Sequence, residues 1–138
     1  MDTKIERLKQ KGVVLTIQRL AVLEFLYHSS SHPTAEAIHT KLKKKYPMLS
    51  LATVYNTLEM LKQAGEIQEL TIGNTKHFDP ISKSHHHLYC RLCKRIIDVE
   101  ISCPVCKSGR VQGHKVEEVQ AVFYGICSDC LQRENGAK

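Results

Sequence analysis

Apolar residues recur at helical spacing through the first 65 residues of the chain. Three helices are predicted there, each beginning at a side chain that can cap its first turn: Thr16, Thr34 and Ser50. The first helix is expected to bury Ile17. The second should continue through Tyr46 until Pro47 stops it. The third should end at Gly65 and turn Thr57 outward.

Beyond residue 65 the spacing changes from helical to alternating. Residues 66–72 and 75–79 flank Gly73-Asn74, a dipeptide typical of a tight hairpin turn. Helices followed by a hairpin predict a winged helix-turn-helix. A short polar stretch follows residue 80, and we place a domain boundary there, between residues 1–80 and 81–138. The second part is predicted to be a small module of strands joined by cysteine-bearing turns.

Composition and charge set limits on the function. The chain has 138 residues, 42% of them hydrophobic and 25% charged, as in an ordinary globular domain. Its net charge of +6 favours a polyanionic partner such as nucleic acid. The first residues are charged, and no apolar run approaches the length of a membrane span. We therefore expect a cytoplasmic protein with no membrane partner.

All six cysteines lie in the second part, as three Cys-x-x-Cys pairs. In a reducing compartment such pairs favour metal binding over disulfides, and two pairs supply the four thiolates of a tetrahedral zinc site. The first pair, Cys90 and Cys93, can combine with Cys127 and Cys130 or with the intervening pair; spacing does not decide. The intervening pair, Cys103 and Cys106, is also a candidate for redox chemistry or for an extra metal.

Histidines suggest a second kind of metal site. His85 and His87 would lie on one face of a strand, while His86 points away. If the following segment forms a hairpin with this strand, Asp98 approaches the two imidazoles. Mixed nitrogen and oxygen ligands suit Fe(II), Mn(II) or Zn(II). The alternative interpretation is a histidine cluster on the surface.

The third predicted helix offers a candidate DNA-reading surface. Its outward residues Thr53, Tyr55 and Asn56 are suited to contact base edges or phosphates in a major groove. Exposed polar residues on a helix are more often simply solvated, so this pattern carries weight only together with the winged-helix context.

Six motifs occur in order along about residues 5–130: LTIQRLAVLEFL, HPTAEAIHTKLKKKYP, SLATVYNTLEMLKQAGEI, HFD, HHHLYCRLCKRIIDVE and FYGICSDC. Together they resemble the ferric uptake regulator family of metal-dependent repressors. The resemblance implies an α+β fold in which an N-terminal winged helix-turn-helix precedes a small α/β dimerisation domain with a four-cysteine zinc site. It also implies a homodimer that binds double-stranded operator DNA, and a regulator rather than an enzyme.

The resemblance also implies the roles of individual residues. Cys90, Cys93, Cys127 and Cys130 correspond to the structural Zn(II) ligands. The regulatory Fe(II) or Mn(II) site would comprise His32, Asp79, His85, His87 and Asp98. Many iron-sensing members carry glutamate where this chain has Asp79 and Asp98, so the chain is more similar to the peroxide-sensing branch of the family. In that branch bound iron reacts with peroxide and a histidine ligand is oxidised. His32 and His85 would be the histidines that are oxidised here. Expected DNA contacts come from Arg19, Ser50, Thr53, Tyr55 and Asn56.

Alternatives within and outside the family stay open. The protein could regulate iron or zinc uptake through metal affinity alone, or be a zinc-ribbon interaction protein or a thiol redox protein that uses Cys103 and Cys106. The stretch around these two cysteines also departs from the family, since relatives typically have a dimer-domain helix there. A further metal site of the family would fall on Ser84, His86 and Val119, two of which lack a usual ligand, so we predict its absence.

Overall fold

The computed structural model describes the chain except for residues 1, 30, 81–85, 118, 137 and 138. Two of the positions discussed above, Ser84 and His85, therefore lie outside the described residues. Contacts divide the chain into two units, Met1–Ser82 and Lys83–Lys138. Across the described residues, none of the helices has both the length and the apolar character needed to cross a membrane.

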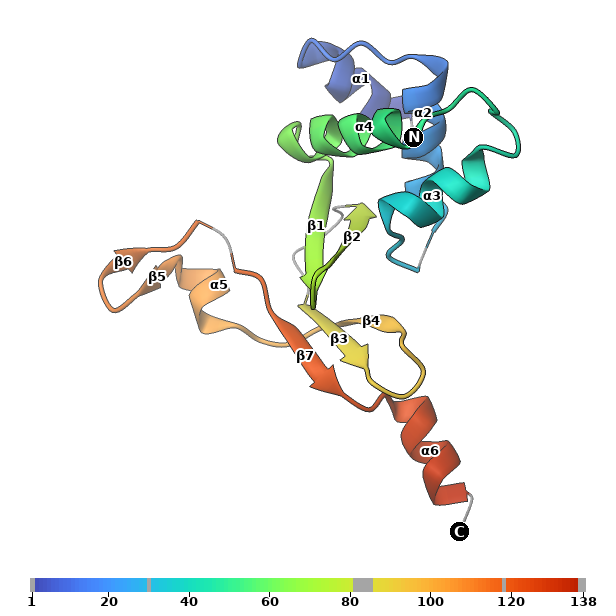
Figure 1. Cartoon of the computed structure of the whole chain (residues 1–138). Helices are drawn as coiled ribbons and strands as arrows, with labels where there is room; N and C mark the ends of the chain where they lie inside the picture. The colour runs from blue at the N-terminus through green and yellow to red at the C-terminus, as the bar shows by residue number, and fades with distance from the viewer. Residues whose placement is uncertain (1, 30, 81–85, 118, 137–138) are drawn as a thin grey trace. The chain divides into compact units, whose positions relative to one another are not determined.

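The first unit is a helical domain with a β-hairpin wing (Figure 1). Its elements are α1 (Asp2–Gln10), α2 (Ile17–Tyr27), α3 (Ala35–Leu42), α4 (Leu51–Gln63), β1 (Ile67–Ile72) and β2 (Thr75–Pro80). The two strands pair antiparallel through all six positions, from Ile67 opposite Pro80 to Ile72 opposite Thr75. The predicted winged helix-turn-helix is confirmed.

Capping residues fix where three of these helices begin. The hydroxyl of Thr16 accepts a hydrogen bond from the Arg19 amide at 3.2 Å. Thr34 and Ser50 accept equivalent bonds, each at 3.1 Å, from amides three residues further on. Each bond satisfies a backbone donor that the helix itself leaves unpaired. The helix starts predicted from the sequence are therefore confirmed.

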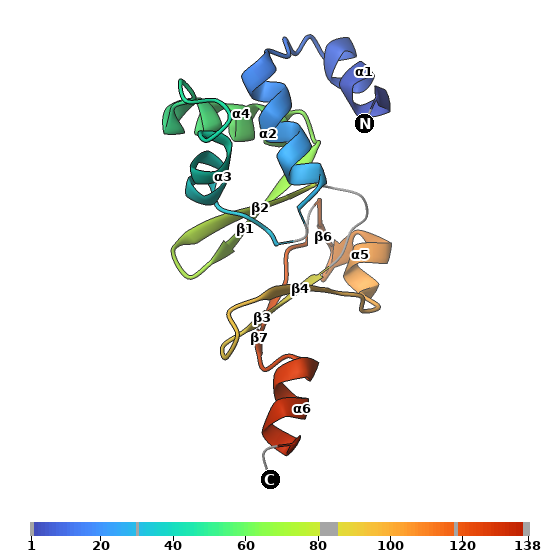
Figure 2. The same cartoon turned by 90° about the vertical axis from the view of Figure 1, so that its right-hand side faces the viewer.

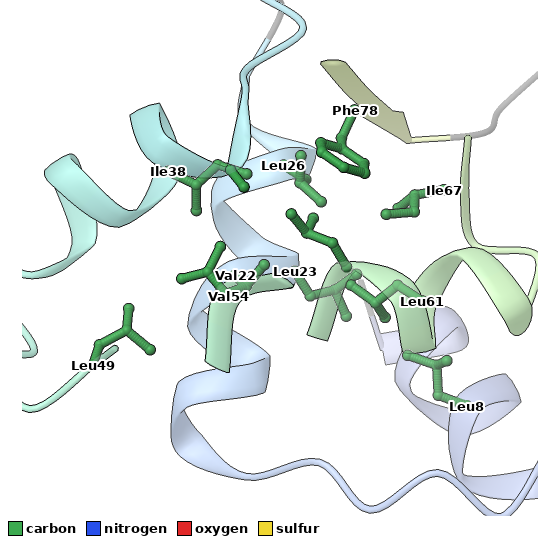
Figure 3. Packing of buried hydrophobic residues seen from close by; sticks show 12 residues of the cluster. Leu8, Val22, Leu23, Leu26, Ile38, Leu49, Val54, Leu61, Ile67 and Phe78 are labelled. Carbon is green, nitrogen blue, oxygen red and sulfur yellow. The ribbon is translucent and has the colours of Figure 1, made fainter. Parts of the chain in front are cut away.

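The core of this unit lies between α2, α3, α4 and the hairpin (Figure 3). Leu23 and Leu26 of α2 are fully buried, as are Val54 and Leu61 of α4. Phe78 of β2 packs against the same cluster. Burial of these side chains is the main favourable contribution to folding. One face of α4 packs against this core, so the opposite face is exposed to solvent.

Three local expectations were wrong. The second helix ends at Leu42, and Lys43–Lys45 form a turn, so that Tyr46 reaches the core from outside the helix. Ile17 is 75% exposed because it occupies the first turn of α2, away from the core. Thr57 is buried, since its hydroxyl donates to the Thr53 carbonyl at 2.7 Å and is thereby satisfied without water.

An ion pair between Arg7 and Glu66 connects α1 to the residues between α4 and β1. Arg7 donates two hydrogen bonds to the Glu66 carboxylate, at 3.0 and 2.9 Å, and Glu66 is 3% exposed. The hydrogen bonds from Arg7 hold the pKa of Glu66 below its usual range. A bidentate pair of this kind has a defined geometry and strong, charge-assisted hydrogen bonds.

Glu66→Gln is expected to lower the free energy of unfolding by about 1–3 kcal/mol at neutral pH, because it removes the charge from both bonds. A carboxylate whose pKa is lowered by folding contributes stability above the unfolded pKa, and this contribution is lost as pH falls through the folded pKa. Urea unfolding from pH 7 to pH 3 should therefore show wild type and variant converging in acid. Glu6→Gln, at an exposed position on α1, is the control; a pH-independent difference for Glu66→Gln would contradict the assignment.

The second unit is built around a three-stranded sheet. Its elements are β3 (His86–Cys90), β4 (Ile96–Val99), α5 (Pro104–Ser108), β5 (Arg110–Val111), β6 (His114–Lys115), β7 (Val122–Gly125) and α6 (Ser128–Gly136). The strand order is β4-β3-β7, with β3 antiparallel to β4 and parallel to β7. Within this unit, Figures 1 and 2 show α5, β5 and β6 to one side of the sheet and α6 beyond its other end.

The strand pattern of this unit was predicted only in part. Among the described residues of 116–126 only Val122–Gly125 form a strand, β7, and the residue pattern did not predict the helices α5 and α6. Both helices are short and carry cysteines, so their apolar periodicity is too weak to stand out in the sequence. The class, an α+β protein with a winged helix followed by a small α/β domain, is confirmed.

Candidate metal centres

Four cysteines converge in the second unit. Cys90 ends β3 and Cys93 lies in the following turn, while Cys127 directly precedes α6 and Cys130 lies in its first turn. Their sulfur atoms all lie within 4.8 Å of one another. Sγ of Cys90 is 3.8 Å from that of Cys130, and the same distance separates Cys93 from Cys127. Such spacing fits four thiolates around a tetrahedral zinc ion.

Hydrogen bonds lower the pKa of Cys90 and of Cys127, whereas contact with the Cys127 sulfur raises the pKa of Cys130 to about 12. The amides of Cys93 and Cys127 donate to Sγ of Cys90 at 3.5 and 3.4 Å. These backbone bonds lower the pKa of Cys90 to about 6. Arg95 donates to Sγ of Cys93 at 3.4 Å and to Sγ of Cys127 at 3.6 Å, and its guanidinium also pairs with Asp129. Because zinc binds the deprotonated sulfur, donors and positive charge at this place favour a metal site.

The spacing of the cysteines left open which pairs combine, and only the family resemblance implied Cys90 and Cys93 with Cys127 and Cys130. In the structure Cys103 and Cys106 lie apart from the four-cysteine cluster and form a separate group with His86. The strand β7, which pairs parallel to β3, carries the chain back so that Cys127 and Cys130 meet Cys90 and Cys93. The alternative ribbon of Cys90, Cys93, Cys103 and Cys106 is not formed.

A histidine and a carboxylate lie together in the first unit. Nε2 of His32 is 3.6 Å from an oxygen of Asp79 on β2. Backbone contacts hold this place, since the Phe78 amide donates to the Pro33 carbonyl at 3.0 Å. His32 has a φ of 51°, a left-handed conformation that is uncommon for a residue with a side chain and occurs often at functional sites.

A matching pair lies in the second unit. His87 on β3 stands directly opposite Asp98 on β4, and its Nε2 is 3.3 Å from the Asp98 carboxylate. The predicted approach of these two residues follows from this antiparallel register. Each unit thus carries one imidazole beside one carboxylate, which are ligands for Fe(II), Mn(II) or Zn(II). The third histidine expected here, His85, is outside the described residues.

The expected DNA-facing residues of helix α4 differ in their exposure to solvent. Tyr55 and Asn56 are exposed, and Thr53 is partly exposed. The Tyr55 hydroxyl donates to the carboxylate of Glu36 on α3, which lowers the pKa of Glu36 and raises that of Tyr55. Ser50 is exposed at the N-terminus of α4, where its side chain caps the helix.

The remaining expected DNA contact, Arg19, lies at the start of α2. Its guanidinium donates to the Val14 carbonyl at 2.6 Å, and the side chain is partly exposed. Sequence reasoning placed neither Glu36 beside Tyr55 nor His86 beside Cys106. Alternation along the strand had set His86 on the face opposite His85 and His87, but it could not show which distant residue lies there.

A winged helix, a four-cysteine cluster and histidine–carboxylate pairs define the class of metalloregulatory DNA-binding proteins. The comparison with known families agrees. Residues 10–124 match the ferric uptake regulator family, and the chain belongs to that family.

Similar proteins within the family include named peroxide regulators. The "Peroxide operon regulator" of Bacillus subtilis (strain 168) is 38% identical over 135 residues, which cover 95% of this chain and 93% of that protein. The "Peroxide-responsive repressor PerR" of Staphylococcus epidermidis is 34% identical over 144 residues, covering 98% of this chain and 93% of that protein.

Solved structures support the fold assignment. PerR from Streptococcus pyogenes, described as a peroxide sensor and gene regulator, is 33% identical with a TM-score of 0.56, and the match covers 93% of this chain and 90% of that one. The ferric uptake regulator Fur of Helicobacter pylori, described as having three functional metal binding sites, has a TM-score of 0.71 over 94% of this chain and 90% of that one. At 22% identity this second match supports the fold alone.

Proposed function

We propose that this protein is a metal-dependent transcriptional repressor that responds to peroxide. The observation that carries the proposal is the pair of aspartates, Asp79 and Asp98, each beside a histidine within its own unit. The identity of 34–38% to peroxide regulators over nearly the whole chain supports the same function.

The proposed regulatory site combines ligands from both units: His32, Asp79, His85, His87 and Asp98. Imidazole and carboxylate donors fit Fe(II) and Mn(II), and they contain no thiolate that would favour a softer metal. A metal ion bound by both units restricts their relative orientation. Metal binding and DNA binding are then linked thermodynamically, so that metal strengthens operator binding and operator DNA strengthens metal binding.

In the proposed complex a homodimer binds a pseudo-palindromic operator. The N-terminal half of α4 enters the major groove, where Thr53 and Asn56 reach base edges. Tyr55 lies on the same helix, and Arg19 and Ser50 contact phosphates beside it. The hydrogen bond from Tyr55 to Glu36 orients the tyrosine ring before DNA binds.

Peroxide response requires iron as the bound metal, because iron can supply electrons to peroxide. His32 and His85 are the residues that receive oxygen. One oxygen atom of hydrogen peroxide would become a carbonyl oxygen on a ring carbon, the hydrogen of that carbon would move to a ring nitrogen, and the other oxygen would leave as water. The modified ring would be a poorer ligand, so the site would lose metal and the protein would release its operator.

The test is peptide mass spectrometry of protein loaded anaerobically with Fe(II), before and after about one equivalent of peroxide. We expect a gain of one oxygen on the peptide that carries His32 or His85, and loss of DNA binding in parallel. Mn(II)-loaded protein is the control and should stay unmodified.

Other outcomes distinguish the remaining candidate functions. Unmodified histidines with DNA binding that still depends on Fe(II) or Mn(II) would indicate a regulator that senses metal by affinity. Oxidation confined to Cys103 or Cys106 would indicate a thiol switch. Operator binding that persists after chelation of all but the structural zinc would contradict a regulatory metal site.

A further inference from the structure

A second cluster of metal-ligating side chains lies in the second unit, away from the four cysteines. It consists of Cys103, Cys106 and His86, whose ligand atoms all lie within 4.8 Å of one another. Sγ of Cys106 is 4.0 Å from Nε2 of His86. Tetrahedral zinc with bonds of about 2.0–2.3 Å holds its ligand atoms roughly 3.5–3.8 Å apart, so only a small contraction is needed.

The turn that carries Cys103 and Cys106 shares two hydrogen bonds with the turn in the four-cysteine cluster, although Cys103 is the N-cap of the helix α5 and Cys90 does not begin a helix. In the Cys90 turn, the amide three residues on donates to Sγ at 3.5 Å, and the amide four residues on donates to the carbonyl at 2.9 Å. In the Cys103 turn the corresponding distances are 3.3 and 3.2 Å. In both turns the two sulfur atoms lie within 4.8 Å of each other, as a zinc knuckle requires.

The third group, His86, is placed by the sheet. It is 6% exposed, and its ring meets the ring of Phe123 on β7 edge to face, with centroids 6.3 Å apart. Its Nδ1 atom is buried and has no hydrogen-bond partner among the described residues. The other ring nitrogen, Nε2, is the one that faces Cys106, so it is the atom that the ring offers to a metal ion.

Alternation along β3 separates this cluster from the regulatory ligands. His86 and His87 are adjacent, so their side chains project to opposite faces of the strand. His87 meets Asp98, whereas His86 meets Cys106. The two groups can therefore bind metal ions independently through different atoms.

We propose that Cys103, Cys106 and His86 form a second thiolate-containing zinc site, distinct from the four-cysteine site. Two thiolates and an imidazole suit Zn(II), whereas the regulatory ligands are nitrogen and oxygen only. Three protein ligands leave the fourth tetrahedral position for water, so this zinc exchanges more readily than one held by four cysteines. Binding joins α5 and the β5–β6 hairpin to β3. This proposal does not depend on the peroxide response.

The experiment uses the full chain with the regulatory ligand removed by His87→Ala, so that bound metal reports only the thiolate sites. Zinc per chain is measured after dialysis against a mild chelator under reducing, anaerobic conditions. Co(II) then replaces the exchangeable zinc, because Co(II)–thiolate charge transfer absorbs in the near ultraviolet. We expect one exchangeable ion per chain in addition to the retained structural zinc.

Three variants test the ligands. Cys103→Ser with Cys106→Ser should abolish the exchangeable ion and its Co(II)–thiolate absorption, while the structural zinc stays. His86→Gln should weaken Co(II) binding by about tenfold or more. The matched control is His114→Ala, an exposed histidine on β6 in the same part of the unit, and it should change neither property.

Two results would overturn the proposal. One is equal zinc content and equal Co(II) absorption with and without Cys103 and Cys106. The other is unchanged Co(II) affinity in His86→Gln, which would remove His86 from the site. Because Cys106 is exposed, its replacement leaves the unit folded, and circular dichroism of each variant verifies this.

Discussion

Cys93→Ser is expected to release the structural zinc and unfold the second unit. Among the described residues of this unit, the buried hydrophobic cluster consists of Cys90, Cys127 and Cys130, with a few partly buried apolar side chains around it. So small an apolar core cannot offset the entropy lost on folding. Structural zinc contributes about 10–16 kcal/mol of binding free energy in small zinc domains, and here most of that energy would stabilise the fold.

Zinc content by elemental analysis and amide dispersion by NMR measure this effect together. Signals from Lys83–Lys138 should collapse, whereas those from Met1–Ser82 should stay dispersed, because the first unit has its own core. Cys106→Ser is the control; its sulfur lies outside the four-cysteine cluster, so the second unit should stay folded. A folded Cys93→Ser protein that keeps its structural zinc would refute the assignment of the four ligands.

The second large effect is expected from His87→Ala, which should abolish metal-dependent DNA binding while the protein stays folded. Removal of this imidazole leaves Asp98 without its histidine partner at 3.3 Å. Even the loss of a group that only orients a ligand weakens metal affinity by about 10–100-fold, so the loss of a ligand should weaken it at least as much. By linkage, the coupling between metal and DNA is lost with it.

Fluorescence anisotropy with Mn(II) tests this expectation without oxidation chemistry. The DNA probe is a fragment selected by the wild-type protein from a random library in the presence of Mn(II). Wild type should bind it more tightly as Mn(II) rises, and His87→Ala should show no such rise. His114→Ala, at an exposed position far along the chain from the proposed ligands, should behave as wild type. Identical Mn(II) dependence in wild type and His87→Ala would remove His87 from the regulatory site.

Much of the first unit could be predicted from sequence because its determinants are local. A capping hydroxyl such as Thr34 lies three residues from the amide it satisfies, and Gly73-Asn74 defines its turn without distant contacts. The predictions of burial were wrong where tertiary packing, and not the local sequence, determines whether a side chain is exposed. Thr57 is polar but buried, since its hydroxyl bonds to its own helix, and Ile17 is apolar but exposed.

The sequence by itself determined the helix starts, the hairpin and the presence of three cysteine turns, because each depends on neighbours a few residues apart. Only the tertiary structure decided which cysteines meet. The parallel pairing of β7 with β3 returns the chain and brings Cys127 to Cys93, 34 positions earlier in the sequence. The same sheet sets His86 beside Cys106. Such contacts depend on strand order and register between distant segments, which no local pattern specifies.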